Sequence, residues 1–172
     1  MKQFVLLSLF LNVIISATAQ FPEHWIGTYS GKMSLLSTGK PADSVSVQLK
    51  IYEILKDSVW SYHMDFHHQA HGDMTKDYLI KKDKNGSFFT DENNGILIPM
   101  TYLDGCFYDC YEVDGMIFHS TMRLFGEDIF YELTGTSLRS GSERDLGNKE
   151  EGSYLVKSYK PAIIQKVLLK KN

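Results

Sequence analysis

The sequence has few of the residues that mark disulfide-rich, disordered or nucleic-acid-binding proteins. Two cysteines among 172 residues exclude a scaffold held by several disulfides, and only four prolines with thirteen dispersed glycines argue against a disordered chain. The formal net charge is −3, so nothing indicates a nucleic acid or an anionic membrane as a partner. Aromatic residues are plentiful, with ten Tyr, ten Phe and two Trp, and this composition favours β-structure.

Motifs of common enzymes are also missing. The chain has no G-x-S-x-G, no H-E-x-x-H and no phosphate-binding loop, which removes the usual local signatures of hydrolases, metalloproteases and nucleotide-binding enzymes. Asp65, Asp109 and Glu112 fall in strand-like runs, where solvent-facing acids are common, and they indicate no acid–base pair. The sequence therefore favours a protein without catalysis.

The long apolar run of the chain, Phe4 to Ser16, lies at its N-terminus. Lys2 precedes this run and the small residues Ala17-Thr18-Ala19 follow it, which is the pattern of a secretory signal peptide. The run is too short for a comfortable membrane span, and no second apolar run of about 18 residues follows. We predict that residues 1–19 are removed, that residues 20–172 form a single domain, and that this domain is secreted or periplasmic.

Apolar and polar residues alternate through the first half of this domain. The side chains expected on one face of successive strands are Trp25, Tyr29 and Met33, then Val45, Val47, Leu49 and Ile51, then Trp60, Tyr62, Met64 and Phe66. In the third run the opposite face carries His63, Asp65 and His67. Such alternation is typical of antiparallel strands with one polar side.

Tight-turn signals separate the later strand-like runs, at Asn85-Gly86, Asn94-Gly95, Asp104-Gly105 and Asp114-Gly115. Sequential hairpins make a meander, and we predict an all-β antiparallel barrel of 8–10 strands, with a two-sheet sandwich as the alternative. The polar segment Ser137–Gly152 is expected to be a long exposed loop. The tail Ala162–Asn172 fits either a closing strand or a short helix.

The opening Trp25-Ile-Gly-Thr-Tyr29, followed by a run of hairpins, resembles the small lipocalin-like (calycin) barrels of secreted bacterial proteins. The resemblance covers residues 20–172 in pattern. It implies that a small, largely apolar or amphipathic molecule binds in the barrel.

The candidate ligand-binding residues are the aromatic and methionine side chains expected to point inward: Trp25, Tyr29, Met33, Trp60, Tyr62, Met64 and Phe66. Trp25 is the one among them most typical of pure packing. His119 and Arg123 share a face of a later strand. If that face is inward they form a cationic patch for a carboxylate, and if it is outward, the interpretation we favour, they are ordinary surface.

Two further clusters are considered. His63, Asp65 and His67 could ligate a divalent metal if their face is inside, or could simply be the solvent side, and no other cofactor is expected. Cys106 and Cys110 could form a disulfide only if a turn separates them, because a strand would hold them too far apart.

The function predicted from the sequence is non-catalytic binding of a small apolar or amphipathic molecule. One alternative is an enzyme that uses the same cavity with the His63/Asp65/His67 group. Another is an extracellular interaction or inhibitor module acting through exposed loops such as Ser137–Gly152.

Overall fold

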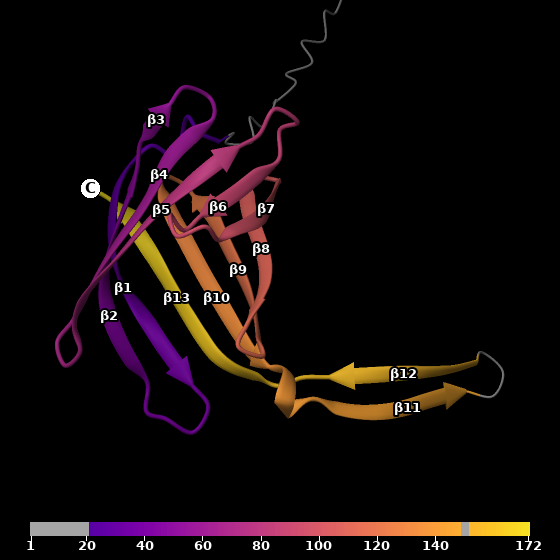
Figure 1. Cartoon of the computed structure of the whole chain (residues 1–172). Helices are drawn as coiled ribbons and strands as arrows, with labels where there is room; N and C mark the ends of the chain where they lie inside the picture. Colours follow the sequence, from indigo (N-terminus) through magenta and orange to yellow (C-terminus); the bar gives the residue numbers. More distant parts are fainter. Residues whose placement is uncertain (1–20, 149–151) are drawn as a thin grey trace, which may run out of the picture.

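A computed structural model describes residues 21–148 and 152–172, with side chains described outside 143–155. The predicted signal peptide, residues 1–19, lies outside the described residues. Ten antiparallel strands close into a barrel (Figure 1). These strands are β1 (Gly27–Ser37), β2 (Asp43–Ile51), β4 (Val59–His68), β5 (Gly72–Lys82), β6 (Phe88–Asp91), β7 (Leu97–Leu103), β8 (Cys106–Val113), β9 (Met116–Phe125), β10 (Asp128–Ser137) and β13 (Pro161–Lys171).

The barrel is a meander with one insertion. Each strand from β4 to β10 pairs with the next, β13 lies between β10 and β1, and pairing of β2 with β4 closes the ring. The short strand β3 (Glu53–Leu55) pairs with the first residues of β4. The predicted antiparallel barrel is confirmed, and a closed ring excludes the two-sheet sandwich.

In the segment Ser137–Gly152, predicted as a loop, residues 137–148 are instead largely regular, and residues 149–151 lie outside the described residues. It contains the 3₁₀ turn η1 (Leu138–Ser140) and strand β11 (Ser142–Asn148), which pairs with β12 (Gly152–Ser158) in a hairpin that projects from the barrel (Figure 1). The loop prediction is wrong because backbone pairing to β12 orders a segment that has no apolar period. The tail is the long strand β13, so the closing-strand alternative holds for Ala162–Lys171.

Tight turns fix the register of the hairpins. Asp104 and Gly105 have φ angles of 49° and 71°, and Asp114 and Gly115 have 52° and 73°. Two successive positive φ angles are typical of hairpin turns whose twist matches that of the flanking strands. These turns place β8 so that Phe107 and Asp109 lie opposite Met122 and Ser120 of β9.

An aromatic cluster closes one end of the barrel. Phe21 lies edge-on to Trp60 with ring centroids 4.7 Å apart, and Trp25 lies 5.3 Å from Phe107. The hydroxyl of Tyr29 donates to the carbonyl of Trp25 at 2.9 Å, which ties β1 to this plug. All these side chains are buried and fill this end of the barrel.

In the described part of the chain, no helix has the length and apolar character needed to cross a membrane.

Candidate functional site

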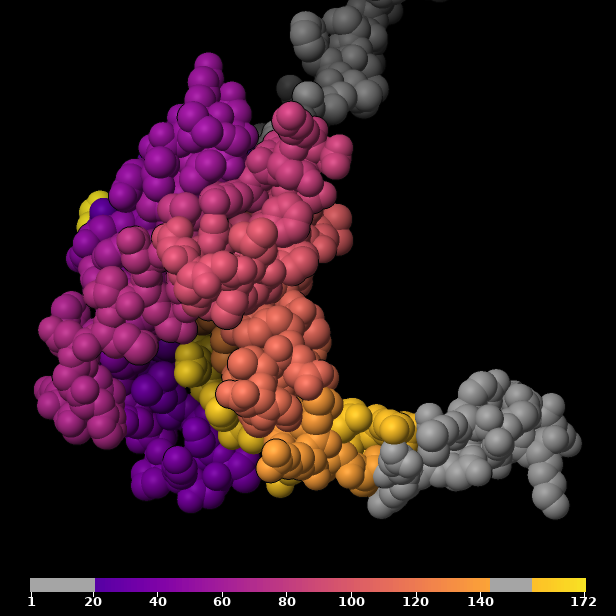
Figure 2. All heavy atoms as spheres, viewed as in Figure 1, coloured from indigo at the N-terminus to yellow at the C-terminus, as the bar shows by residue number. Residues whose placement is uncertain are grey.

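The inward side chains leave two adjoining chambers in the half of the barrel away from the aromatic plug. The inner chamber has a volume of about 70 Å³, and the outer chamber, nearer the mouth, about 300 Å³. Both are lined by Met33, Phe66, Lys76 and Gln165. Figure 2 shows the opening between the β4–β5 hairpin and β8–β9, where yellow atoms of β13 are visible behind them.

The outer chamber is mainly apolar. Its other lining residues are Leu35, Val45, His68, His71, Gly72 and Met74. They lie where β1 ends, β2 begins and the β4–β5 hairpin turns, so they surround the mouth of the barrel. A hydrocarbon or aromatic group would bury apolar surface here.

The inner chamber is lined by four tyrosines from four strands: Tyr62 on β4, Tyr78 on β5, Tyr111 on β8 and Tyr131 on β10. Burial raises the pKa of all four, that of Tyr111 to about 12, so their hydroxyls stay protonated at neutral pH. Within the described residues, the hydroxyls of Tyr62, Tyr111 and Tyr131 form no hydrogen bond. The chamber thus offers several unused hydrogen-bonding groups.

Asp109 lies among these tyrosines. Its Oδ2 accepts a hydrogen bond from the Ser120 hydroxyl at 2.7 Å, whereas its Oδ1 is buried and has no partner. Burial raises the pKa of Asp109 above its ordinary value despite that hydrogen bond. The interpretation of Asp109 as a solvent-facing acid is wrong. Every second residue of β8 points into the barrel, and Asp109 shares this inner face with Phe107 and Tyr111.

A groove in the barrel wall lies next to the inner chamber. The β7–β8 ladder ends at the pair Met100–Asp109, and the next residue of β7 is Pro99, which has no N–H to donate. Beyond this point a groove of about 300 Å³ separates the two strands, and it shares Glu92, Ile98 and Tyr111 with the inner chamber. Asp109 therefore lies where the wall begins to open.

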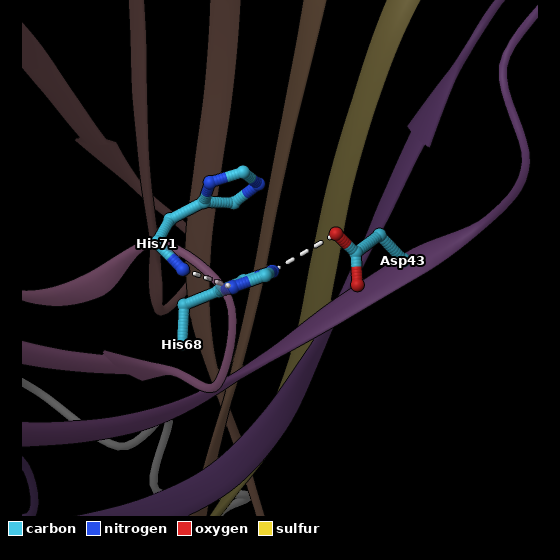
Figure 3. A group of neighbouring side chains, drawn as sticks. All are labelled: Asp43, His68 and His71. Carbon is cyan, nitrogen blue, oxygen red and sulfur yellow. Dashed lines mark hydrogen bonds and ion pairs between the residues drawn. The ribbon is translucent and has the colours of Figure 1, made fainter.

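The rim of the mouth carries a cluster of Asp43, His68 and His71, whose potential ligand atoms lie within 4.8 Å of one another (Figure 3). His68 Nδ1 accepts the backbone N–H groups of Ala70 and His71, each at 3.1 Å, so its proton resides on Nε2, 2.9 Å from Asp43 Oδ2. The hydrogen bond from His68 lowers the pKa of Asp43. A metal would have to displace these hydrogen bonds, and we assign the cluster to fastening the β4–β5 turn to β2.

The predicted inward residues separate into two groups. Met33, Tyr62, Met64 and Phe66 line the inner chamber, whereas Trp25, Tyr29 and Trp60 pack at or near the plugged end. His119 and Arg123 lie exposed on the outer face of β9, and the Arg123 guanidinium lies 5.2 Å from the centroid of the Phe130 ring. They cannot form a cationic patch inside the barrel, because Ser120 and Met122 hold the inward positions of that strand.

His63, Asp65 and His67 share one face, as predicted, but that face is outside the barrel. His63 Nε2 lies 3.1 Å from Asp65 Oδ1 and His63 Nδ1 lies 3.0 Å from Asp77, while His67 Nδ1 lies 3.0 Å from Asp73. Hydrogen bonds from Lys50 and Thr75 lower the pKa of Asp65 to about 2. A divalent metal at this group stays a prediction, and it would have to displace these contacts. Because the face points outward, the group does not line the cavity that the enzyme alternative requires.

Cys106 and Cys110 are free thiols, the first buried and the second exposed. Both lie on the continuous strand β8, where four residues span roughly 13 Å. A disulfide requires Cα atoms about 4.4–6.8 Å apart, so this pairing does not form. The exposed Cys110 Sγ lies 3.7 Å from His119 Nε2 on the outer face.

The sequence interpretation did not identify the polar residues of the inner chamber, Tyr78, Asp109, Tyr111, Ser120 and Tyr131. A signal was present, since Asp109 shares its strand face with Phe107, and Ser120 shares its face with Met122.

No protein-family model and no curated protein matches the sequence. A protein of unknown function from the DUF3598 family of Nostoc punctiforme is similar in structure, with a TM-score of 0.57 and 12% identity over 87% of this chain. The match covers 48% of that chain, so this protein spans about half the length of the Nostoc protein. The S-type phycobiliprotein lyase CPES of Guillardia theta has a TM-score of 0.59 and 9% identity over 87% of this chain and 89% of its own. Identities this low show the fold alone, which is a lipocalin-like barrel.

Proposed function

We propose that this protein is a secreted, non-catalytic binding protein for a small amphipathic molecule held in the two chambers. The observation that carries the proposal is their adjacency: an apolar outer chamber and a polar inner chamber share four lining residues inside one barrel. Such a sequence of environments suits a ligand with an apolar body and a polar end. Small-molecule sites are mostly apolar cavities with a few convergent polar groups, and this cavity has that composition.

The side chains lining the chambers support binding rather than catalysis. Ser120 donates its hydroxyl hydrogen to Asp109 directly, and the histidines of the lining, His68 and His71, lie at the rim in the other chamber. A serine hydroxyl activated for nucleophilic attack is normally bonded to a base such as histidine. Ser120 is bonded to a carboxylate instead. The geometry thus favours reversible, non-covalent binding.

Export of the domain is part of the proposal. Phe21 already packs against Trp60 in the aromatic plug, so a chain beginning at Gln20 keeps every contact of the described barrel. Expression of the full chain in a secreting host, followed by N-terminal sequencing of the exported protein, should give Gln20 as the first residue. An unprocessed chain retained in the cytoplasm would contradict export.

Native mass spectrometry on the protein from its own cells tests the binding function. We expect a non-covalent small molecule that solvent extraction removes and that the emptied barrel takes up again from the extract. Leu133→Trp, which fills the inner chamber, should abolish uptake. Its matched control Thr134→Trp, on the outward face of the same strand, should retain uptake. Failure of the folded, emptied protein to take up any molecule would overturn the proposal.

A further inference from the structure

The unpartnered Oδ1 of Asp109 is the starting point. A buried carboxylate oxygen without a hydrogen bond is costly, and such groups are normally paired with a cation or several donors. Ser120 donates its hydroxyl and its backbone N–H to the carboxylate, and no lysine or arginine of the described residues forms an ion pair with Asp109. His119 lies close enough to lower the pKa of Asp109, but it is exposed on the outer face of the barrel.

The surroundings of Asp109 are aromatic. The rings of Tyr62 and Tyr78 lie 6.3 Å apart, and Tyr111 stacks on Phe118 at 5.5 Å. The face of an aromatic ring is electronegative and attracts an ammonium group within about 6 Å of its centroid. The chamber already shows this interaction, because the Lys76 ammonium lies 5.5 Å from the Tyr78 centroid.

The charge of the lining points the same way. Two carboxylates, Asp109 and Glu92, face a single ammonium, that of Lys76. An anionic group in the chamber would lose its hydration and would be repelled by the unpartnered Asp109 Oδ1. A cationic group would supply the missing partner and would rest among tyrosine rings.

We propose that the inner chamber binds the positively charged nitrogen of an organic amine or quaternary ammonium, with Asp109 as the counter-charge and the tyrosine rings as the surrounding cage. This inference rests on the proposed function and names the ligand class. A buried water molecule needs about 10–15 Å³ of cavity volume. A chamber of about 70 Å³ therefore admits a group with the four heavy atoms of a trimethylammonium. The apolar remainder of the ligand lies in the outer chamber.

Calorimetric titration with three ligands that share an octyl chain tests the head group: octyltrimethylammonium, octanol and octanoate. We expect the ammonium to bind roughly tenfold or more tightly than octanoate at pH 7. The Asp109 carboxylate attracts the ammonium and repels the carboxylate of octanoate. Asp109→Asn, which keeps the shape of the side chain, should remove most of this preference. Asp114→Asn is the matched control, because it removes a carboxylate from an exposed turn at the end of the same strand.

The tyrosine cage has its own pair of variants. Tyr62→Phe keeps the ring and should keep the preference for the ammonium, whereas Tyr62→Leu should weaken it. Circular dichroism confirms that each variant is folded.

The outcomes separate the two proposals. If none of the three ligands binds, both the binding function and this inference fail. If octanoate or octanol binds as tightly as the ammonium, the binding function stands and the cationic head group is refuted. If Asp109→Asn retains the preference, Asp109 is not the counter-charge.

Discussion

Replacement of Asp109 by asparagine should stabilise the protein, although the side chain lies inside the barrel. The wild-type carboxylate has one oxygen with no partner, and an unsatisfied buried polar group costs about 1–3 kcal/mol, more when it is charged. Asparagine can still accept the hydrogen bond from Ser120, and its amide nitrogen takes the place of the unpartnered oxygen, so the change removes the charge from this position. We therefore expect the free energy of unfolding to rise by about 1–3 kcal/mol at pH 7, which corresponds to about 2–12 °C in Tm for a domain of this size.

The stability gained by Asp109→Asn should depend on pH, and the raised pKa of Asp109 determines the direction. Because the folded protein binds this proton more tightly than the unfolded chain, the wild type loses stability as pH rises from the unfolded pKa, about 3.9, through the higher folded pKa. Asparagine does not titrate. The stabilisation by Asp109→Asn should thus vanish in acid, grow through that window and reach a plateau toward neutral pH.

Urea unfolding monitored by tryptophan fluorescence measures this effect, since Trp25 and Trp60 are both buried in the plugged end. The titration should run from pH 4 to pH 8 on the wild type, Asp109→Asn and the control Asp114→Asn, which should show no such pH-dependent gain. A variant less stable than the wild type at pH 7, or a gain of equal size at both ends of this range, would refute the interpretation of Asp109 as a carboxylate lacking a partner.

Three further predictions concern the barrel itself. Gly31→Ala should cost roughly 1–3 kcal/mol in chemical denaturation, because its Cβ would lie 2.7 Å from the Leu168 carbonyl oxygen; unchanged stability would disprove this close approach. Trp60→Ala should cost about 3–5 kcal/mol by opening the aromatic plug, and a loss well under 1 kcal/mol would show that the plug is loosely packed. In thiol labelling under native conditions Cys110 should react quickly and Cys106 only after unfolding; equal rates would contradict their different burial.

Much of the barrel could be predicted because most strands alternate regularly and pair with the next strand along the chain. The alternation of Trp60, Tyr62 and Met64 fixes which face of β4 is buried, and Asp-Gly pairs mark the hairpin turns. The position of β13 between β1 and β10 could not be predicted, since Tyr29 pairs with Lys171 across most of the chain. Nothing local encodes such a distant partner.

The site was predicted only on its apolar side. Met33, Tyr62, Met64 and Phe66 were placed inward by their hydrophobic character, but a lone acid in a strand, such as Asp109, is typical of a solvent face. Its inward position follows from the register of β8 in the closed ring. The same limit applies to His63 and His67. The sequence places them on one polar face of β4, but only the closed ring shows that this face points outward.

The most direct test of ligand binding in the chambers is an NMR titration of protein labelled with ¹³C at the methionine methyl groups, using octyltrimethylammonium as the probe. Met33 and Met64 line the inner chamber and Met74 the outer one, whereas Met122 lines neither and is buried. Binding in the chambers predicts saturable shifts and probe contacts at Met33, Met64 and Met74, with Met122 little affected. Saturable binding that leaves Met33 and Met64 unchanged, or no binding, would contradict the assignment of the chambers as the ligand site.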